Sequence, residues 1–302
     1  MFFKQKVDLC SVFKSAGLLL LVPGFMAFFC LPLCIIFQEY FALIPFAVTG
    51  AATTLIGYGL YRFCGERKDT HLWDAMLAAA LGWLISPLFA AIPYIWIAHY
   101  HQAVWENNSA LLSMSNPLNA FFEVLSGFTS TGLSMINEPQ KLPYVLQFWR
   151  AFTQWIGGVG LIVFVIAFLE PYHKEYRLFY AETRSKELGK SLIESGRMIW
   201  LIYLIYTAFF IVILSLAQMP IWEAICHTMT GISTGGFTIS VGSFTHYSPL
   251  IKIITIVMMI MGAISFTIHY KVLFEKDYKI LWKNMQHILL WILFIIGSVG
   301  TF

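Results

Sequence analysis

The chain has 302 residues, of which 59% are hydrophobic and only 12% charged, with a formal net charge of +3 and a mean hydropathy of +0.73. Soluble domains usually contain about 45–50% apolar and roughly 25% charged residues. This composition excludes an ordinary soluble enzyme, a disordered chain and a nucleic-acid binder, and it indicates an all-α polytopic membrane protein.

Six runs are apolar enough to cross a membrane as helices, which takes about 20 residues each. They are 16–37, 41–63, 73–98, 145–169, 198–217 and 250–270. A seventh run begins near residue 287 and is slightly short of a span at about 16 residues. The first run is too long for a signal peptide and has no small-residue cleavage site, so we interpret it as a membrane anchor.

The basic residues favour one orientation. If the N-terminus is cytoplasmic, all but three of the 19 Lys and Arg residues fall on the cytoplasmic side. The exceptions are Lys141, Arg150 and Lys252, and we interpret Arg150 as an anchor at the outer interface. The positive-inside rule therefore predicts a cytoplasmic N-terminus. In a bacterium the membrane would be the inner (plasma) membrane.

Two outer connections contain apolar stretches about half as long as a membrane-crossing helix. The stretches are Ala120–Phe128 and Ile221–Met229, each preceded by a proline and followed by Gly, Ser and Thr residues. A half-length helix followed by glycine-rich coil predicts a re-entrant loop. Such backbone is tolerated at membrane depth only where it is packed in protein or lines a wet cavity. We therefore expect both segments to line a pathway; the alternative is two interfacial loops without function.

The two segments also repeat each other. Residues 120–134 read AFFEVLSGFTSTGLS, and residues 224–238 read AICHTMTGISTGGFT. With Ala120 aligned to Ala224, Gly132 falls opposite Gly236, and the hydroxyl residues around them also match. Gly158 and Gly262 fall opposite each other in the helices that follow. The predicted architecture is two leading spans and then two repeats of span, re-entrant pore loop and span.

This repeated unit suits a monovalent cation. A half-helix that enters from outside points its C-terminal end, with about half a negative charge, at the membrane centre. Backbone carbonyls in the coil can replace the water shell of the ion. Residues 129–134 and 233–238 contain no carboxylate, which favours K⁺ or Na⁺ over Ca²⁺.

Four sequence blocks resemble the TrkH/KtrB branch of the Trk/Ktr/HKT potassium uptake transporter family, and the resemblance runs from about residue 5 to the end of the chain. The first three are SGFTSTGLS (126–134), WRAFTQWIGGVGLIVF (149–164) and TGISTGGFT (230–238). The fourth is GAISFTIHY (262–270). The resemblance implies four repeats around one pore, two leading spans, and membrane potassium uptake through a filter with one central glycine per repeat. It also implies a homodimer that binds a cytosolic nucleotide-binding regulatory subunit of the TrkA type. The apolar composition predicts contact with membrane lipid and no nucleic-acid partner.

The same resemblance assigns the site residues. Gly132 and Gly236 are the implied central glycines of two selectivity filter strands. The carbonyls expected to face K⁺ belong to Thr129, Ser130, Thr131, Ser233, Thr234 and Gly235. Glu123 and His227 occupy matching places on the two half-helices. We interpret them as support, either attracting K⁺ or bracing the filter strand by a hydrogen bond; the alternative is a side chain paired near the outer surface.

The chain departs from the family pattern in having two filter repeats rather than four. We predict a two-span region over 1–72, repeats over 73–190 and 191–284, and the truncated first span of a third repeat over 285–302. The chain is then a truncated product, or two chains must pool their repeats. The alternative function is a non-conducting remnant or membrane subunit. We expect the protein to transport K⁺, to tolerate Rb⁺ and to exclude Na⁺ imperfectly. The transport mechanism is left open between channel-like flux and symport with H⁺ or Na⁺.

Enzyme chemistry has no support in the sequence. The motifs HExxH, the P-loop and CxxC are all missing, so we predict no catalytic residues and no cofactor beyond the transported K⁺. The five cysteines are interpreted as small buried hydrophobes. His99 and His101 are interpreted as loop histidines, and Glu223 as an acid suited to the start of its helix.

Overall fold

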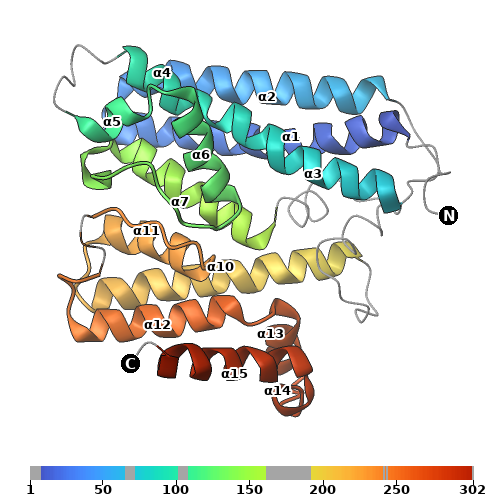
Figure 1. Ribbon diagram of the computed structural model, residues 1–302, viewed down its shortest axis with the longest axis vertical. Helices are drawn as coiled ribbons and strands as arrows, with labels where there is room; N and C mark the ends of the chain where they lie inside the picture. The colour runs from blue at the N-terminus through green and yellow to red at the C-terminus, as the bar shows by residue number, and fades with distance from the viewer. Residues whose placement is uncertain are drawn as a thin grey trace.

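The computed structural model describes residues 8–64, 72–100, 108–160, 192–240, 242 and 244–300, and every regular element in these ranges is a helix. Figure 1 shows the longer helices lying roughly side by side, with two half-length helices, α6 and α11, among them. The first group is α1 (Leu9–Ile36), η1 (Tyr40–Ala42), α2 (Leu43–Phe63), α3 (Leu72–Ala90), α4 (Ile92–Tyr100), α5 (Ser109–Ser113), α6 (Pro117–Phe128), η2 (Pro139–Lys141) and α7 (Tyr144–Val159). The second group is α10 (Leu192–Leu216), α11 (Ile221–Ile232), α12 (Pro249–Ala263), α13 (Phe266–Leu273), α14 (Ile280–Lys283) and α15 (Met285–Gly300).

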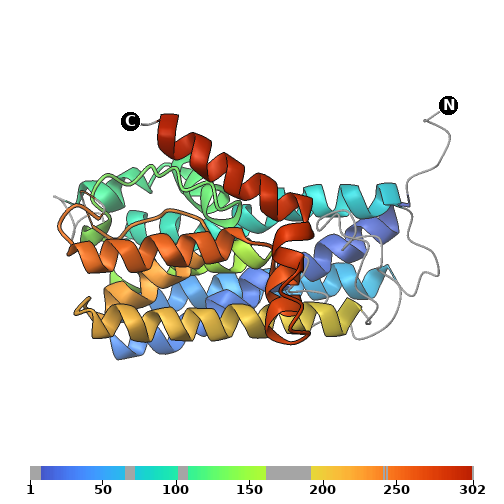
Figure 2. The same cartoon turned by 90° about the horizontal axis from the view of Figure 1, so that it is seen from below.

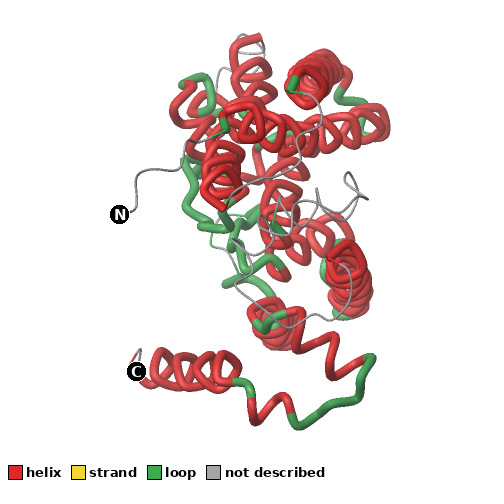
Figure 3. Tube along the Cα trace, turned by 90° about the vertical axis from the view of Figure 1, so that its right-hand side faces the viewer, coloured by secondary structure: helices red, strands yellow, loops and turns green. Residues whose placement is uncertain are grey.

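Four of the six predicted spans are confirmed. Among the described residues, the helices long and apolar enough to cross a membrane cover Leu9–Ile36, Tyr40–Phe63, Met76–Tyr100 and Gly196–Leu216. The predicted span 145–169 begins as α7, and its second half lies outside the described residues. The apolar run near the end of the chain forms α15, which lies at the edge of the molecule beyond α12 (Figure 3).

The predicted span 250–270 is wrong as a single helix. α12 ends at Ala263 and α13 begins at Phe266, and the two helices are bent by 97°. Figure 2 shows α13 turned across the direction of α12. Ile264 and Ser265 are extended, with ψ of 135° and 129°. Apolarity alone could not reveal the break because both arms are apolar.

A histidine on α13 stabilises the bend. The last carbonyls of a helix have no partner within it. His269 Nε2 lies 2.9 Å from the carbonyl oxygen of Met261, and its Nδ1 lies 3.0 Å from the hydroxyl of Tyr206 on α10. Because a carbonyl can only accept, Nε2 donates to Met261 and Nδ1 accepts from Tyr206. The ring thus ties α13 to both α12 and α10.

The leading helices pack through glycine. A Cβ atom on Gly17 of α1 would lie 2.6 Å from the carbonyl oxygen of Gly57 on α2, and a Cβ atom on Gly57 would lie 2.6 Å from that of Gly17. Small residues allow membrane helices to approach at backbone distance. α1 and α2 therefore form a close hairpin beside the two repeats.

The loop of this hairpin caps α7. The first N–H groups of a helix have no partner within it, and Pro143 at the N-cap of α7 provides no side-chain hydrogen bond. Glu39 accepts hydrogen bonds from the backbone N–H groups of Tyr144 (2.7 Å) and Val145 (2.9 Å). Partial burial raises the pKa of Glu39, and the two N–H donors counteract part of that rise. α7 is therefore anchored to the leading hairpin at its N-terminal end.

Replacing Glu39 by alanine is expected to loosen the start of α7 and to lower the free energy of unfolding by about 1 kcal/mol, as for loss of a helix N-cap. Hydrogen exchange at the amides of Tyr144 and Val145, together with thermal unfolding in detergent, measures the effect. Glu39→Gln keeps one carbonyl acceptor and should lose less. Unchanged exchange at these amides in Glu39→Ala would show that the cap does not stabilise the helix.

Candidate functional site

The first half-helix begins and ends with specific backbone interactions. At its start, Asn116 caps α6 by accepting from the N–H of Leu118 at 3.0 Å. At its end, the N–H groups of Ser130 and Thr131 donate to the carbonyls of Gly127 (2.9 Å) and Ser126 (3.0 Å). This pair of bonds is a Schellman motif, which needs a left-handed residue just after the helix. Ser130 takes that position, with φ of 51°.

The second half-helix ends in the same way. The N–H groups of Thr234 and Gly235 donate to the carbonyls of Gly231 (3.0 Å) and Thr230 (2.8 Å). Thr234 is left-handed with φ of 54°. Each residue matches its counterpart in the predicted repeat. The repetition seen in the sequence is therefore also present in backbone conformation.

The hydroxyl groups at these helix ends bond locally. Thr129 Oγ1 donates to the carbonyl of Leu125 at 2.8 Å and therefore accepts from Thr131 Oγ1, also at 2.8 Å. In the second repeat, Ser233 Oγ donates to the carbonyl of Thr230 at 2.9 Å. The hydroxyls of Thr129 and Ser233 thus tie the start of each coil to its half-helix, whereas Ser130 Oγ is buried without a hydrogen-bond partner.

The two predicted central glycines are both left-handed. Their φ values are 78° at Gly132 and 84° at Gly236, a region that glycine enters at no steric cost. A Cβ atom on Gly132 would lie 2.1 Å from the carbonyl oxygen of Gly235, whereas one on Gly236 would meet nothing within 4 Å. Gly132 is therefore required by both conformation and space, and it marks a close approach of the two coils.

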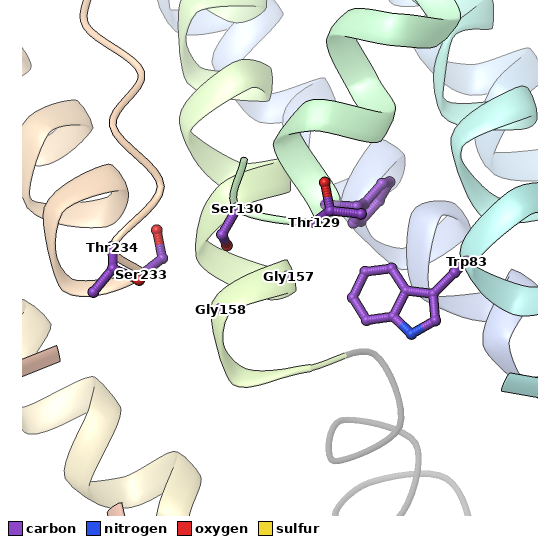
Figure 4. Close-up of a pocket in the computed structure, with 8 residues that line it drawn as sticks. Trp83, Thr129, Ser130, Gly157, Gly158, Ser233 and Thr234 are labelled. Atoms are coloured by element: carbon purple, nitrogen blue, oxygen red, sulfur yellow. The ribbon is translucent and has the colours of Figure 1, made fainter. Parts of the chain in front are cut away.

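A cavity of about 480 Å³ lies at the inner ends of the half-helices, where the coils begin (Figure 4). Matched residues of the two repeats line it: Thr129 with Ser233, and Ser130 with Thr234. The rest of the lining is Trp83, Phe128, Gly157 and Gly158. The other four predicted filter residues, Thr131, Gly132, Gly235 and Gly236, follow these along the coils.

The predicted match of Gly158 with Gly262 is wrong by one residue. A Cβ atom on Gly157 would lie 2.0 Å from the Phe128 carbonyl oxygen, and one on Gly262 would lie 2.2 Å from the matching carbonyl oxygen of Ile232. Gly157 is therefore the structural counterpart of Gly262. The offset arises because the coil before α12 is one residue longer than the coil before α7. Gly158 instead packs against Ser233 of the second repeat.

Glu123 of α6 stabilises the first coil by hydrogen bonds. Its side chain is buried, and its carboxylate accepts from the N–H of Met135 at 2.8 Å and from Ser134 Oγ at 3.0 Å. Arg150 Nε lies 2.8 Å from the same carboxylate. Of the interpretations given above for Glu123, these contacts correspond to the bracing hydrogen bond.

The interpretation of Arg150 as an interfacial anchor is wrong. The residue is only 2% exposed, and its guanidinium contacts Glu123 and the carbonyl oxygen of Thr238. A buried charge is tolerated when it is paired and hydrogen-bonded. The position of Arg150 near the start of its helix is typical of a residue at the membrane–water interface. Its partners Glu123 and Thr238 are distant in the sequence and meet it only in the folded protein.

His227 has different surroundings from its counterpart Glu123. Its ring is buried, and its Nε2 lies 3.3 Å from the hydroxyl of Tyr247. The same hydroxyl is hydrogen-bonded to the carboxylate of Glu223. Glu223 therefore has a specific partner besides its favourable place in the first turn of α11. The two repeats support their coils with different chemistry.

The described residues contain no group of three or more His, Cys, Asp or Glu side chains arranged to hold a metal ion. All five cysteines are free thiols, with Cys30, Cys34 and Cys226 buried and the other two half-buried. His99 lies at the end of α4 and bonds to the carbonyl of Ile95 at 2.9 Å. His101 lies outside the described residues.

The helices and their paired half-length segments define a multi-pass α-helical membrane protein with repeated re-entrant loops. The family model TrkH, described as a cation transport protein, matches residues 84–296. The chain therefore belongs to the TrkH family of cation transport proteins, whose members are transporters.

Known relatives and a solved structure agree with this membership. An uncharacterized cation transporter of Methanocaldococcus jannaschii is 32% identical over 88% of this chain and 52% of its own length. The Trk system potassium uptake protein TrkH of Salmonella typhimurium is 28% identical over 73% of this chain and 44% of its own length. The chain spans about half the length of these relatives. The crystal structure of the potassium transporter TrkH from Vibrio parahaemolyticus has the same fold, with a TM-score of 0.77, 23% identity, and coverage of 97% of this chain and 58% of that one.

The geometry predicts that the two central glycines tolerate substitution unequally. An alanine at either position is strained by the left-handed φ, at a cost of about 1 kcal/mol. Gly132→Ala also brings its Cβ atom into a clash with the carbonyl oxygen of Gly235, whereas Gly236→Ala meets no such clash. Thermal unfolding of the purified protein in detergent should therefore show a clearly larger loss for Gly132→Ala. Equal losses would mean that the close approach of the two coils does not contribute to stability.

Proposed function

We propose that the protein serves membrane potassium uptake through a selectivity filter lined by the carbonyls of its two re-entrant coils. The observation that carries this proposal is the pair of half-helices that end in matched left-handed turns and line one cavity with matched residues. The filter residues are Thr129, Ser130, Thr131 and Gly132 from the first coil and Ser233, Thr234, Gly235 and Gly236 from the second.

The chemistry of the two coils favours a weakly hydrated monovalent cation. Each half-helix directs the negative end of its dipole toward the cavity. Carbonyl oxygens can replace the water shell of K⁺ without a fixed negative charge. The nearby carboxylate of Glu123 is neutralised by Arg150 and engaged by the coil backbone, so it supports the filter rather than attracting the ion. We expect K⁺ and Rb⁺ to be carried and Na⁺ to be imperfectly excluded.

The relatives named for potassium uptake support the same assignment. From the family resemblance we further propose a homodimer that binds a cytosolic nucleotide-binding regulatory subunit of the TrkA type. We also propose a location in the bacterial inner (plasma) membrane, and the charge distribution supports an N-terminus in the cytoplasm. In this proposal K⁺ is the transported substrate, and the protein is neither an enzyme nor dependent on a cofactor.

A second candidate function is that of a membrane subunit that does not conduct alone. Thr129, Thr131, Thr234 and Gly236 are exposed in the structure. Two coils provide only part of a ring of oxygen ligands around an ion. Further repeats, or a second chain, would then be needed to complete the filter.

Uptake of Rb⁺ by the 302-residue chain in cells that lack their own potassium uptake systems distinguishes the two functions. We expect uptake by the wild-type chain and none by Gly132→Asp, because an aspartate side chain would collide with the carbonyl of Gly235. Both proteins must be shown to reach the membrane.

Wild-type uptake by Gly132→Asp would overturn the filter assignment. No uptake by the wild-type chain, with the protein present in the membrane, would contradict conduction by this chain alone and favour the non-conducting subunit.

A further inference from the structure

One face of α7 follows the second coil along its length. Arg150, Gln154 and Gly158 are each four residues apart and therefore lie on the same side of the helix. Arg150 Nη1 donates to the carbonyl of Thr238 at 2.9 Å, and the Oε1 atom of Gln154 accepts from the N–H of Phe237 at 3.1 Å. Further along, Gly158 packs against Ser233. A helix of the first repeat thus holds the coil of the second.

Arg150 also contacts the first coil. Its Nη2 donates to Ser134 Oγ at 3.1 Å, while its Nε is paired with Glu123, which itself accepts from the N–H of Met135. Ser134 and Thr238 are matching positions of the repeat. One guanidinium group therefore contacts the same position of both coils.

The shape of the guanidinium suits this bridging role. Its five donors project in a rigid planar fork, whereas a lysine ammonium is a compact charge on a flexible stem. The Arg150 guanidinium carbon also lies 4.3 Å from the ring centroid of Phe237 in the second coil. Hydrogen bonds in three directions and the aromatic face together fix both its position and its plane.

The second repeat lacks this residue at the matching place. Counted from the starts of α7 and α12, the counterpart of Arg150 is Thr255. Its hydroxyl donates to the carbonyl of Ile251 in its own helix at 2.9 Å. The position that matches Glu123 is His227, which contacts Tyr247 instead. The bridge therefore belongs specifically to the junction between the first and second repeats.

We propose that Arg150 is a positioning residue that sets the distance between the two coils and thereby the discrimination between K⁺ and Na⁺. The inference rests on the proposed filter function. Arg150 does not line the cavity; it acts through the backbone of Thr238 and through Glu123. If the contacts of Arg150 are weakened, the distance between the two coils can change. The carbonyl oxygens of the coils are then no longer spaced for K⁺, the larger ion, and the preference for K⁺ over Na⁺ falls.

The test compares Arg150→Lys with a double variant, Glu123→Gln with Arg150→Met. Arg150→Lys keeps the positive charge but loses the planar guanidinium group. The double variant removes the charges of both Arg150 and Glu123, so that no buried carboxylate is left unpaired. Lys252→Met is the matched control, because Lys252 is an outer basic residue that contacts the carbonyl of Thr245 rather than Arg150 or Glu123. The readouts are the ratio of Rb⁺ to Na⁺ uptake and the protection against thermal unfolding in detergent by Rb⁺ relative to Na⁺.

We expect the preference for Rb⁺ to fall about tenfold in Arg150→Lys, the size expected for the loss of one charge-assisted hydrogen bond. The double variant should lose at least as much, and Lys252→Met should keep the wild-type ratio. A wild-type ratio in Arg150→Lys and in the folded double variant would overturn the positioning role and leave the filter assignment intact. If the wild-type chain shows neither uptake nor ion-specific protection, the filter function fails and the positioning role fails with it.

Discussion

Backbone that leaves a helix inside a membrane must find its hydrogen-bond partners in protein, because lipid offers none. The two coils that follow α6 and α11 meet this constraint in three ways. Each half-helix closes with a Schellman motif, small hydroxyl residues bond back to the helix ends, and buried side chains bond to the coil backbone beyond them. Without these partners the glycine-rich coils could not remain at membrane depth, and the cavity at their inner ends would not form.

α7 provides many of the side chains that bond to the two coils, which explains why this membrane helix contains several buried polar residues. Gln147, Arg150 and Gln154 are all buried within a helix of a membrane protein, where polar groups are costly unless they are paired. Two consecutive glycines on the same helix, Gly157 and Gly158, allow it to touch the ends of both half-helices. α7 therefore supports both repeats, and its N-terminal end is held in turn by Glu39 from the leading hairpin.

The sequence predicts the features that depend on local composition. The half-helices follow from short apolar stretches with a proline before them, and the repeat follows from matching these two segments. The burial of Arg150 does not, because its partners Glu123 and Thr238 are 27 and 88 residues away. The break in the predicted span 250–270 was missed because both arms are apolar and its stabilising contact comes from a histidine side chain. The one-residue error at Gly158 reflects a longer coil, which sequence matching without a gap cannot detect.

We propose that the two matched coils together form one cation site. A crystal of the protein soaked in Rb⁺, with its anomalous scattering recorded, tests this most directly. We expect an Rb⁺ peak between residues 129–132 and 233–236, surrounded by backbone carbonyls from both coils, and a weaker or absent peak when K⁺ competes. Well-ordered coils without an Rb⁺ peak between them, or a peak ligated by carboxylates elsewhere, would contradict it.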